Sequence, residues 1–309
     1  MKAIVCTRYG PPEVLRLQDV DCPVPGANDV MIRIRATAVT PSDCTIRSGI
    51  PAAPFAMRMM MRVVTGFARP RRPIPGAVLA GEIEAIGAKV RRFRVGERVW
   101  AFTSLRMGYC AQRICLPATF RLLTAAPSNL SDDEAAAIPY GGLIASYFLG
   151  KAKITRGQRV VVYGASGANG TCAVQLAKHF GAHVSAVCST ANLELVRSLG
   201  ADIVLDYTQE QTPVLGRYDL VFDAVGRRKT SLLKTALRDA LTPIGRYISV
   251  DDTLPRVRRD DLLRLRTLAE AGKLKPVIDR RYKLERIVEA HHYVEHGHKR
   301  GNVIVTIAD

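Results

Sequence analysis

The sequence predicts an α/β protein in which a doubly wound parallel sheet follows a β-rich domain. Strands and helices alternate through the middle of the 309-residue chain, and parallel strands need such long helical crossovers. Ahead of them, short β-rich segments are punctuated by Gly and Pro, which is typical of an irregular antiparallel barrel. We therefore expect one domain over residues 1–124, to which residues 273–309 return, and a second over residues 125–272.

The β-rich domain is inferred from short apolar segments without helical periodicity. The expected strands are Met1–Thr7, Val30–Ala36, Leu79–Ile86, Arg98–Phe102 and Tyr109–Leu116. The pattern changes at Ser131, a favourable N-cap residue that has Glu134 three positions later. This capping-box pattern predicts the start of an alanine-rich helix.

The most informative segment runs Arg159-Val-Val-Val-Tyr-Gly164-Ala-Ser-Gly167-Ala-Asn-Gly170 and continues with helical apolar spacing to Phe180. It predicts a buried strand, a glycine turn and a helix. Such glycines let the backbone approach a pyrophosphate, and the N–H groups at a helix start attract an anion. A dinucleotide is therefore the expected ligand.

The rest of the chain continues the alternation of strands and helices. The expected strands are His183–Val187, Ile203–Leu205, Tyr218–Phe222 and Arg246–Val250, and the expected helices are Asn192–Leu199, Asp260–Ala271 and Leu284–Glu295. A closing strand, Asn302–Ile307, is expected to return to the first domain.

The end of the second strand of the parallel sheet bears on which dinucleotide binds. NAD sites usually place an Asp or Glu there to hold the ribose 2′-hydroxyl. This chain has Cys188, Ser189 and Thr190 instead, and small hydroxyl side chains admit and hydrogen-bond a 2′-phosphate. NADPH is the expected cofactor, while Glu194, further along, keeps NAD(H) as the less favoured alternative.

The composition is ordinary for a globular protein except for a formal net charge of +17. The basic residues fall in scattered groups without interleaved aromatic residues, so a solvated arginine-rich surface is favoured over specific nucleic-acid binding.

No apolar run reaches the length of a membrane span. Seven irregularly spaced cysteines fit free thiols in a reducing compartment. We expect a soluble, cytoplasmic protein.

The segment Phe55–Arg69 contains four methionines and three arginines. Flexible Met side chains adapt to varied apolar ligands, so the segment could form a substrate lid. A short amphipathic helix packed on the core is an equally good interpretation.

Several further motifs follow one another in a recognisable order. They are Pro41–Gly49, Gly81–Gly87, Val95–Val99, Val196–Tyr207, Asp223–Gly226 and Gly297–Gly301. With the glycine turn, they make the chain resemble the medium-chain dehydrogenases/reductases, and more narrowly their zinc-independent, quinone-oxidoreductase-like branch. The resemblance implies a GroES-like substrate domain and a Rossmann domain, with the cofactor in the cleft between them.

The resemblance also allows zinc to be tested by position. Zinc-dependent members have a cysteine ligand where this chain has Thr40, and Gly-His-Glu where it has Gly76-Ala77-Val78. Neither Thr nor Ala offers a thiolate or an imidazole, so no metal is expected. His292 and His296 are one helical turn apart, but a solvated helix face is favoured over a metal site for the histidine cluster to which they belong. That cluster consists of His291, His292, His296 and His298.

Without a metal, the implied reaction is hydride transfer to an electron-poor acceptor, either a quinone or an α,β-unsaturated carbonyl. Candidate catalytic residues are Thr40, Ser42, Asp43 and Tyr140. For Asp43 a structural role in its turn is favoured, because an Asp in a turn often bonds its own backbone.

The resemblance implies that the cofactor is contacted by the glycine turn, by the loops after the following strands, and by the tail. The implied residues are Ser166, Gly167, Ala168, Asn169, Gly170, Ser189, Asn192, Tyr207, Val225, Gly226 and Arg300. Asn169 departs from the family, which normally has an aliphatic residue there. Arg300 is equally compatible with a plain surface position.

The leading hypothesis is an NADPH-dependent reductase of a small-molecule quinone or enone. One alternative is an alcohol dehydrogenase without zinc. Another is a nucleotide-binding protein of low turnover that uses its basic surface to bind RNA or a protein partner. The stretch from Tyr247 to Asp261 is shorter than in many relatives, which have a further strand there that often serves in dimerisation, so a homodimer is left open.

Overall fold

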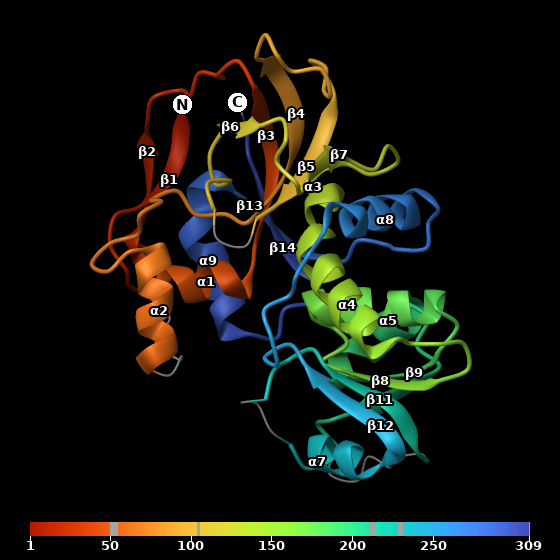
Figure 1. Cartoon of the computed structure of the whole chain (residues 1–309). Coiled ribbons are helices and arrows are strands. Elements are labelled where there is room, and N and C mark those ends of the chain that lie inside the picture. The colour runs from red at the N-terminus through yellow and green to blue at the C-terminus, as the bar shows by residue number, and fades with distance from the viewer. Residues whose placement is uncertain (50–54, 104–105, 210–213, 215, 228–230, 309) are drawn as a thin grey trace. The chain divides into compact units, whose positions relative to one another are not determined.

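The fold comes from a computed structural model of the chain (Figure 1), which describes residues 1–49, 55–103, 106–209, 214, 216–227 and 231–308. The chain divides into two compact units, one of Met1–Pro139 with Ile278–Asp309 and one of Tyr140–Val277. Helix α3 (Asp132–Ala136), which the sequence suggested would open the second domain, packs against strands of the first unit. Its Asp133 carboxylate accepts a bond of 2.8 Å from Arg281, which ties α3 to the returning tail.

The second unit is built on a five-stranded sheet in which every neighbouring pair is parallel, as the alternation of elements predicted. Its spatial order is β10-β9-β8-β11-β12. The strands are β8 (Arg159–Tyr163), β9 (His183–Cys188), β10 (Ile203–Asp206), β11 (Tyr218–Asp223) and β12 (Leu241–Ser249). Central residues such as Val160 and Val161 are completely buried, because parallel sheets are covered on both faces.

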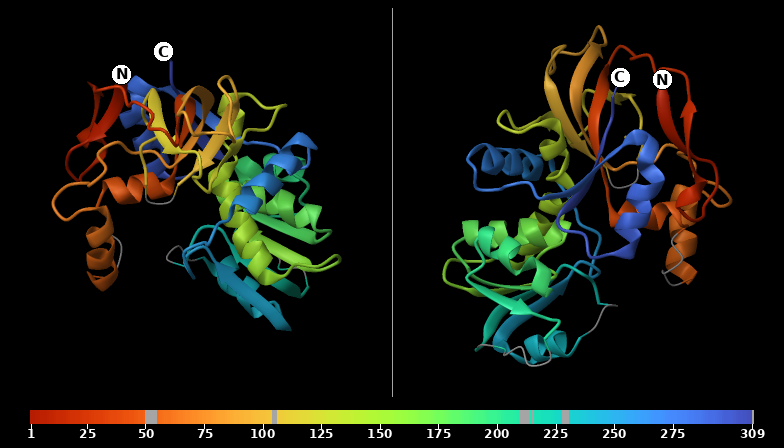
Figure 2. Two further views of the ribbon diagram at one scale, coloured as in Figure 1. Left: turned by 45° about the horizontal axis from the view of Figure 1, so that its top comes forward. Right: turned by 180° about the vertical axis from the view of Figure 1, so that it is seen from behind.

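Helices join these strands and cover the sheet. They are α4 (Pro139–Ala152), α5 (Ala168–His179), α6 (Leu193–Ser198), α7 (Leu232–Asp239) and α8 (Arg259–Glu270). Figures 1 and 2 show α5 and α7 on opposite sides of the sheet. This follows from right-handed crossovers, because the chain moves outward in one direction from β8 to β10 and in the other from β11 to β12.

Strand β12 is longer than the predicted Arg246–Val250. Its register with β11 shifts between Tyr218, which pairs with Leu241, and Leu220, which pairs with Arg246. The inserted residues include Pro243, which has no amide hydrogen to donate to a ladder. Sequence periodicity therefore detected only the regular half of the strand.

The first unit contains a seven-stranded sheet and a separate two-stranded sheet. The large sheet has the order β13-β14-β3-β4-β5-β7, with β6 also paired to β3, and the small one joins β1 to β2. The strands are β1 (Lys2–Cys6), β2 (Leu15–Asp19), β3 (Asp29–Val39), β4 (Val78–Ile86), β5 (Arg98–Phe102), β6 (Arg113–Pro117), β7 (Leu123–Ala125), β13 (Ile278–Lys283) and β14 (Asn302–Thr306). Its helices, besides α3, are α1 (Pro41–Arg47), α2 (Phe55–Thr65) and α9 (Ile287–His296).

The tail of the chain belongs to the first unit. Strand β14 pairs antiparallel with β3, through partners such as Val303 and Val39. The sequence did not predict β13, which pairs parallel with β14 through the crossover helix α9. In the described parts of the chain, no helix has both the length and the apolar character needed to cross a bilayer.

Candidate functional site

The glycine turn forms between β8 and α5, as predicted. The amides of Gly164 and Ala165 both donate to the Val187 carbonyl on β9, at 3.0 and 2.9 Å. Gly164 has a φ of +79°, which an L-residue rarely adopts. The turn therefore needs a glycine here to reverse direction directly above the sheet.

Two other glycines allow backbones to pack closely around the turn. A Cβ added to Gly170 would lie 2.1 Å from the Gly164 carbonyl oxygen and 2.6 Å from the Ala165 Cα. A Cβ on Gly141, in α4, would lie 2.1 Å from the Ala168 carbonyl oxygen. These contacts fix the first turn of α5 against β8 and α4.

Gly167 differs from these glycines, because an added Cβ would come no closer than 3.6 Å to any atom. It is the N-cap of α5 and provides no side-chain cap to the helix amides. The first N–H groups of any helix have no partner inside that helix. The amino end of this 12-residue helix is thus open to an anion.

The glycine turn meets a second loop at the point where the strand order reverses. A Cβ on Gly164 would lie 2.2 Å from Cγ2 of Val225, which follows β11. In doubly wound sheets, ligands bind at the carboxyl ends of the strands beside this reversal. Gly164 and Val225 therefore mark the expected dinucleotide crevice of this unit.

The second loop, Asp223–Gly226, is held by a buried polar network. One Asp223 oxygen accepts the amides of Val225 and Gly226, each at 3.1 Å. The other lies 2.7 Å from the Lys234 Nζ and accepts the Tyr247 hydroxyl at 2.7 Å. Burial, followed by the bond to Asp223, raises the pKa of Tyr247, which keeps this hydroxyl a donor. Sequence reasoning missed both Lys234 and Tyr247.

The loop after β9 contains two of the predicted cofactor residues. Asn192 Nδ2 donates to the Ser189 hydroxyl at 2.9 Å, while Asn192 Oδ1 is buried without a hydrogen-bond partner. Asn169 Oδ1, in the first turn of α5, is likewise buried and unpartnered. Glu194, the basis of the NAD(H) alternative, is exposed on α6.

Asp206 closes the other side of this loop. Its carboxylate accepts the Thr190 hydroxyl at 2.6 Å and the Thr208 hydroxyl at 2.7 Å. Although desolvation opposes ionisation, these hydrogen bonds lower the pKa of Asp206. Because the Thr190 hydroxyl donates to Asp206, Ser189 is the candidate for a cofactor contact at the end of β9. Beside it, the Tyr207 ring lies 6.5 Å from the Tyr163 ring, centroid to centroid.

In the first unit, Thr40 and Asp43 form a capping box at the start of α1. Asp43 Oδ2 accepts the Thr40 amide at 2.8 Å and the Thr40 hydroxyl at 2.6 Å. Burial raises the pKa of Asp43 to about 6 in spite of these bonds. Asp43 Oδ1 is buried and has no hydrogen-bond partner. Asp43 therefore caps the first turn of α1.

The remaining candidates are divided between the units. Ser42 is half-buried on α1, while Tyr140 is buried at the start of α4 in the second unit. Arg300 is an exposed residue of the first unit whose amide donates to Asp279 at 2.9 Å.

At the positions where zinc-dependent relatives have their metal ligands, this chain has Thr40, Ala77 and Val78. The Thr40 hydroxyl is bonded to Asp43, and Ala77 and Val78 are buried apolar residues. Over the described residues, no three His, Cys, Asp or Glu side chains are grouped to hold a metal ion.

The histidines of α9 correct one expectation, since the whole cluster is not a solvated face. His291 is buried, with Nδ1 3.5 Å from the Cys44 sulfur, and desolvation lowers its pKa to about 3. His292 Nε2 lies 2.6 Å from a carboxylate oxygen of Glu13.

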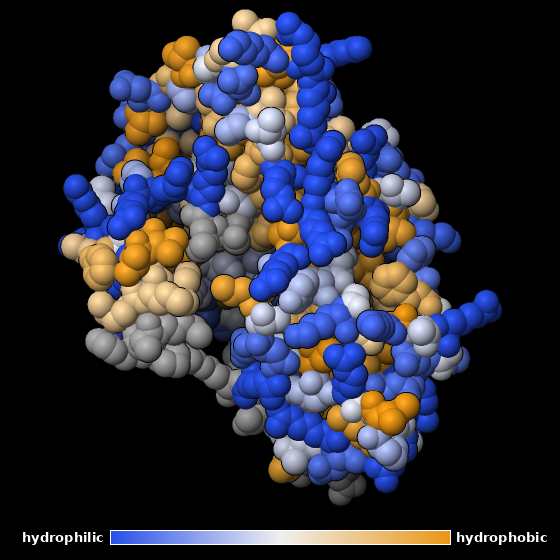
Figure 3. All heavy atoms as spheres, in the orientation of Figure 1, coloured by the Kyte–Doolittle hydropathy of each residue, from blue (hydrophilic) through white to orange (hydrophobic). Residues whose placement is uncertain are grey.

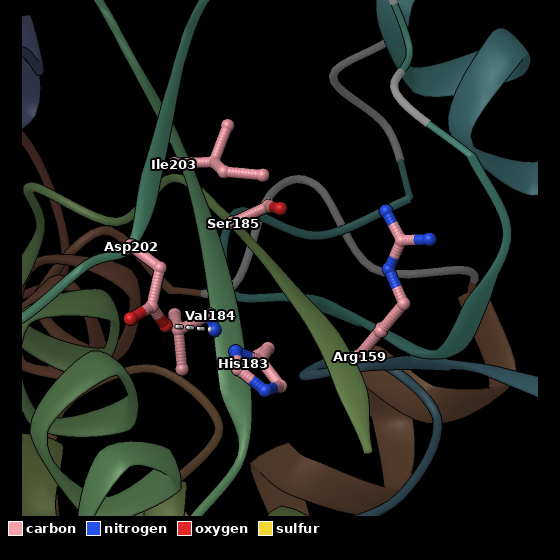
Figure 4. A pocket seen from close by; sticks show the side chains of 6 residues that line it. All are labelled: Arg159, His183, Val184, Ser185, Asp202 and Ile203. Carbon is pink, nitrogen blue, oxygen red and sulfur yellow. Dashed lines mark hydrogen bonds between the residues drawn. The ribbon is translucent and has the colours of Figure 1, made fainter. Parts of the chain in front are cut away.

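A surface pocket of about 250 Å³ lies at the opposite end of the parallel sheet from the glycine turn (Figure 4). Arg159 and His183, which line it, are the first residues of β8 and β9. Ligands of doubly wound sheets bind at the carboxyl ends. This pocket is therefore separate from the candidate dinucleotide site.

The chain is similar in sequence and in structure to known dehydrogenases and oxidoreductases. Residues 26–153 match the family described as alcohol dehydrogenase GroES-like domain, and residues 199–305 match zinc-binding dehydrogenase. The chain is 32% identical to an NADPH-dependent alkenal/one oxidoreductase of Arabidopsis thaliana and to a 2-methylene-furan-3-one reductase of Solanum lycopersicum, covering 99% of this chain and 79% of each relative. A solved quinone oxidoreductase from Coxiella burnetii superimposes with a TM-score of 0.84 at 25% identity, covering 100% of this chain and 99% of that one.

The glycine turn, the reversal of strand order beside it and these similarities agree with one another. The predicted Rossmann and GroES-like folds are confirmed. The chain belongs to the medium-chain dehydrogenase/reductase superfamily, in its quinone-oxidoreductase-like branch.

Proposed function

We propose that the protein is an NADPH-dependent reductase that transfers a hydride to a quinone or an α,β-unsaturated carbonyl without the help of zinc. The observation that carries this proposal is the engagement of Thr40 by Asp43 at 2.6 Å, at the position of a zinc ligand in zinc-dependent relatives. The buried apolar side chains of Ala77 and Val78 occupy the place of the others. An acceptor that receives no polarisation from a metal must already be electron-poor.

The second unit fits a dinucleotide. The open amino end of α5, with Ser166, Gly167, Ala168 and Gly170, would hold the pyrophosphate. The two unpartnered oxygens of Asn169 and Asn192 would accept hydrogen bonds from cofactor hydroxyl or amide groups.

The cofactor's specificity would come from the loop after β9. Ser189 and Asn192 would hold the 2′-phosphate in the absence of a carboxylate at the end of that strand. Tyr207, Val225 and Gly226 would contact the rest of the cofactor from the neighbouring loops, with Arg300 as a contact from the tail. NADPH supplies the hydride from its nicotinamide ring.

The hydroxyl groups of Thr40, Ser42 and Tyr140 are the proposed donors to the oxygen that becomes negative as the hydride is added. Asp43 would act as a positioning residue, because its carboxylate fixes the orientation of the Thr40 hydroxyl. The relatives are named as an alkenal/one oxidoreductase, a 2-methylene-furan-3-one reductase and a quinone oxidoreductase, so neither a zinc-free alcohol dehydrogenase nor an RNA-binding protein is favoured.

Two further properties belong to the proposal. A cytoplasmic location is supported by seven cysteines that are all free thiols. A homodimer could form through β12, because this strand is at the edge of the parallel sheet. Sedimentation of the purified protein would measure its oligomeric state.

The test is turnover with matched acceptors. NADPH oxidation would be followed with a quinone, with an alkenal and with the corresponding saturated aldehyde, before and after exhaustive treatment with a metal chelator. We expect reduction of the first two acceptors only, unaffected by the chelator, and weaker activity with NADH. Reduction of the saturated aldehyde, or loss of activity after chelation, would contradict the proposal.

A further inference from the structure

Helix α2 turns an apolar face away from the first unit. Five apolar side chains between Met59 and Phe67 are more than a third exposed, with a maximum of 58% at Met60. They are Met59, Met60, Val63, Val64 and Phe67, which we call the α2 apolar face. The spacing of one, four, five and eight residues places them on one side of the helix and of the turn after it.

The other side of α2 is fastened to Tyr9. The guanidinium of Arg62 lies 4.7 Å from the centre of the Tyr9 ring. The Tyr9 hydroxyl donates to the Gly66 carbonyl at 2.8 Å, and the Arg71 amide donates to Thr65 at 2.8 Å. Arg62 therefore faces Tyr9, while the apolar residues on the opposite side of the helix are left at the surface.

The surroundings of this face are exclusively basic in sequence. Residues 44–81 contain six arginines and not one Asp or Glu. Arg69, Arg71 and Arg72, just after the helix, are all exposed. Figure 3 shows orange and tan surface over the position of α2, with blue surface next to it.

We propose that the α2 apolar face, with Arg69, Arg71 and Arg72, attaches the protein to the surface of an anionic lipid bilayer. An 11-residue helix cannot span a membrane. An amphipathic helix with basic neighbours instead lies in the interface, with its apolar side chains below the headgroups and its cations against anionic lipids. A second copy of this chain fits less well, because it would bring two sets of arginines together.

The proposed attachment involves residues of the first unit alone. The interface would be formed by α2 and the residues that follow it, all within the first unit. The glycine turn belongs to the second unit and takes no part in the attachment. The residues proposed to contact the bilayer are therefore different from those proposed to bind NADPH or the acceptor.

The test is flotation of the full-length protein with vesicles of phosphatidylcholine alone or of phosphatidylcholine with phosphatidylserine. We expect binding to the anionic vesicles only, weakened by salt. Met60→Ser with Val64→Ser should weaken this binding roughly tenfold or more. Arg69→Gln, Arg71→Gln and Arg72→Gln should each weaken it about fivefold. The matched control, Leu254→Ser with Ile244→Ser, removes two exposed apolar side chains of the second unit and should leave binding unchanged.

A second measurement reports insertion directly. The chain has one tryptophan, Trp100, which is completely buried, so Met60→Trp adds an interfacial probe. Its emission should shift to the blue on anionic vesicles, while that of Leu254→Trp should not. Equal binding by the Met60→Ser/Val64→Ser variant and the wild type would overturn the proposal. An emission spectrum of Met60→Trp that does not shift on anionic vesicles would also overturn it, as would self-association through α2 in place of vesicle binding. A loss of turnover with water-soluble acceptors in Met60→Ser/Val64→Ser would reveal a substrate lid and overturn it as well.

Discussion

Lys234 and Asp223 form a buried ion pair, with the lysine Nζ 2.7 Å from a carboxylate oxygen and side-chain exposures of 4% and 0%. Lys234 also donates to the Gly226 carbonyl at 2.8 Å, while Asp223 accepts the Gly226 amide. Both ends of the pair thus hold the same loop. A buried ion pair adds little net stability over apolar packing, because desolvation offsets the attraction. Its effect here is to fix the loop beside the glycine turn.

Lys234→Met should therefore affect both stability and cofactor binding. Removing one partner leaves Asp223 buried without its counter-charge, which costs about 3 kcal/mol of unfolding free energy. The freed loop should also raise the Kd for NADPH. Denaturant unfolding and NADPH titration measure the two effects.

The matched control is Lys178→Met, because Lys178 pairs with Asp202 at 2.8 Å with both side chains about a third exposed. Such surface pairs contribute under about 1 kcal/mol. If the two lysine variants lost the same stability and bound NADPH alike, the loop would not depend on the buried pair.

Two glycines of the nucleotide turn should respond differently to one added methyl group. Gly170→Ala would force a Cβ to 2.1 Å from a backbone oxygen, so we expect a loss of about 1–3 kcal/mol or more of stability. In Gly167→Ala, the nearest contact of the added Cβ would be the Gly164 carbonyl oxygen at 3.6 Å, and the φ of −81° at this position suits any residue. It should fold normally but bind NADPH roughly tenfold or more weakly, because the methyl group occupies the approach of the pyrophosphate.

Thermal unfolding and NADPH titration of both variants would separate the two roles. Normal NADPH affinity in Gly167→Ala would mean that the pyrophosphate lies elsewhere. Normal stability in Gly170→Ala would mean that α5 can shift away from β8.

The glycine turn was predictable because all of its determinants are local in sequence. The strand, the glycines and the helix occupy Arg159–His179 without interruption. The capping box at Ser131 was predictable for the same reason, and its bond from the Glu134 amide to the Ser131 hydroxyl is 3.3 Å long. Thr40-Pro-Ser-Asp43 is a similar local signal, with Pro41 at the first helical position. It could have revealed α1.

Features that depend on distant contacts were not predictable. Lys234 lies in α7 and looks like an ordinary polar residue of a surface helix, since nothing nearby in sequence marks it as buried. Strand β13 reads Ile-Asp-Arg-Arg-Tyr-Lys, which lacks apolar alternation. It forms a strand because β14 offers it an edge. In both cases tertiary contacts override the local pattern.

Cofactor preference should respond to charge at the end of β9. Ser189→Asp places a carboxylate where NAD-specific sites have one. We expect it to weaken NADPH binding at least about tenfold, because like charges in one site cost several kcal/mol, and to improve NADH relative to NADPH. The ratio of kcat/KM for the two cofactors is the measurement. Ser189→Ala, which removes the hydroxyl without adding charge, should weaken NADPH binding less. An unchanged ratio in Ser189→Asp would place the 2′-phosphate away from this loop.

The stability of the protein should depend on pH through Asp43. The folded state raises the pKa of this carboxyl from 3.8 to about 6, because burial disfavours the charged form. Between these values the folded state keeps a proton that the unfolded state releases, so the contribution of Asp43 is present at low pH and is lost as pH rises through about 6. Asp43→Asn keeps a side-chain acceptor for Thr40 but cannot ionise.

From pH 4 to pH 7, wild type should therefore lose about 2 kcal/mol of unfolding free energy relative to Asp43→Asn. Urea unfolding of the two proteins across this range measures the difference. A pH-independent difference between wild type and Asp43→Asn would mean that Asp43 stays ionised down to its ordinary pKa. The hydrogen bonds from Thr40 would then offset the effect of burial on its pKa.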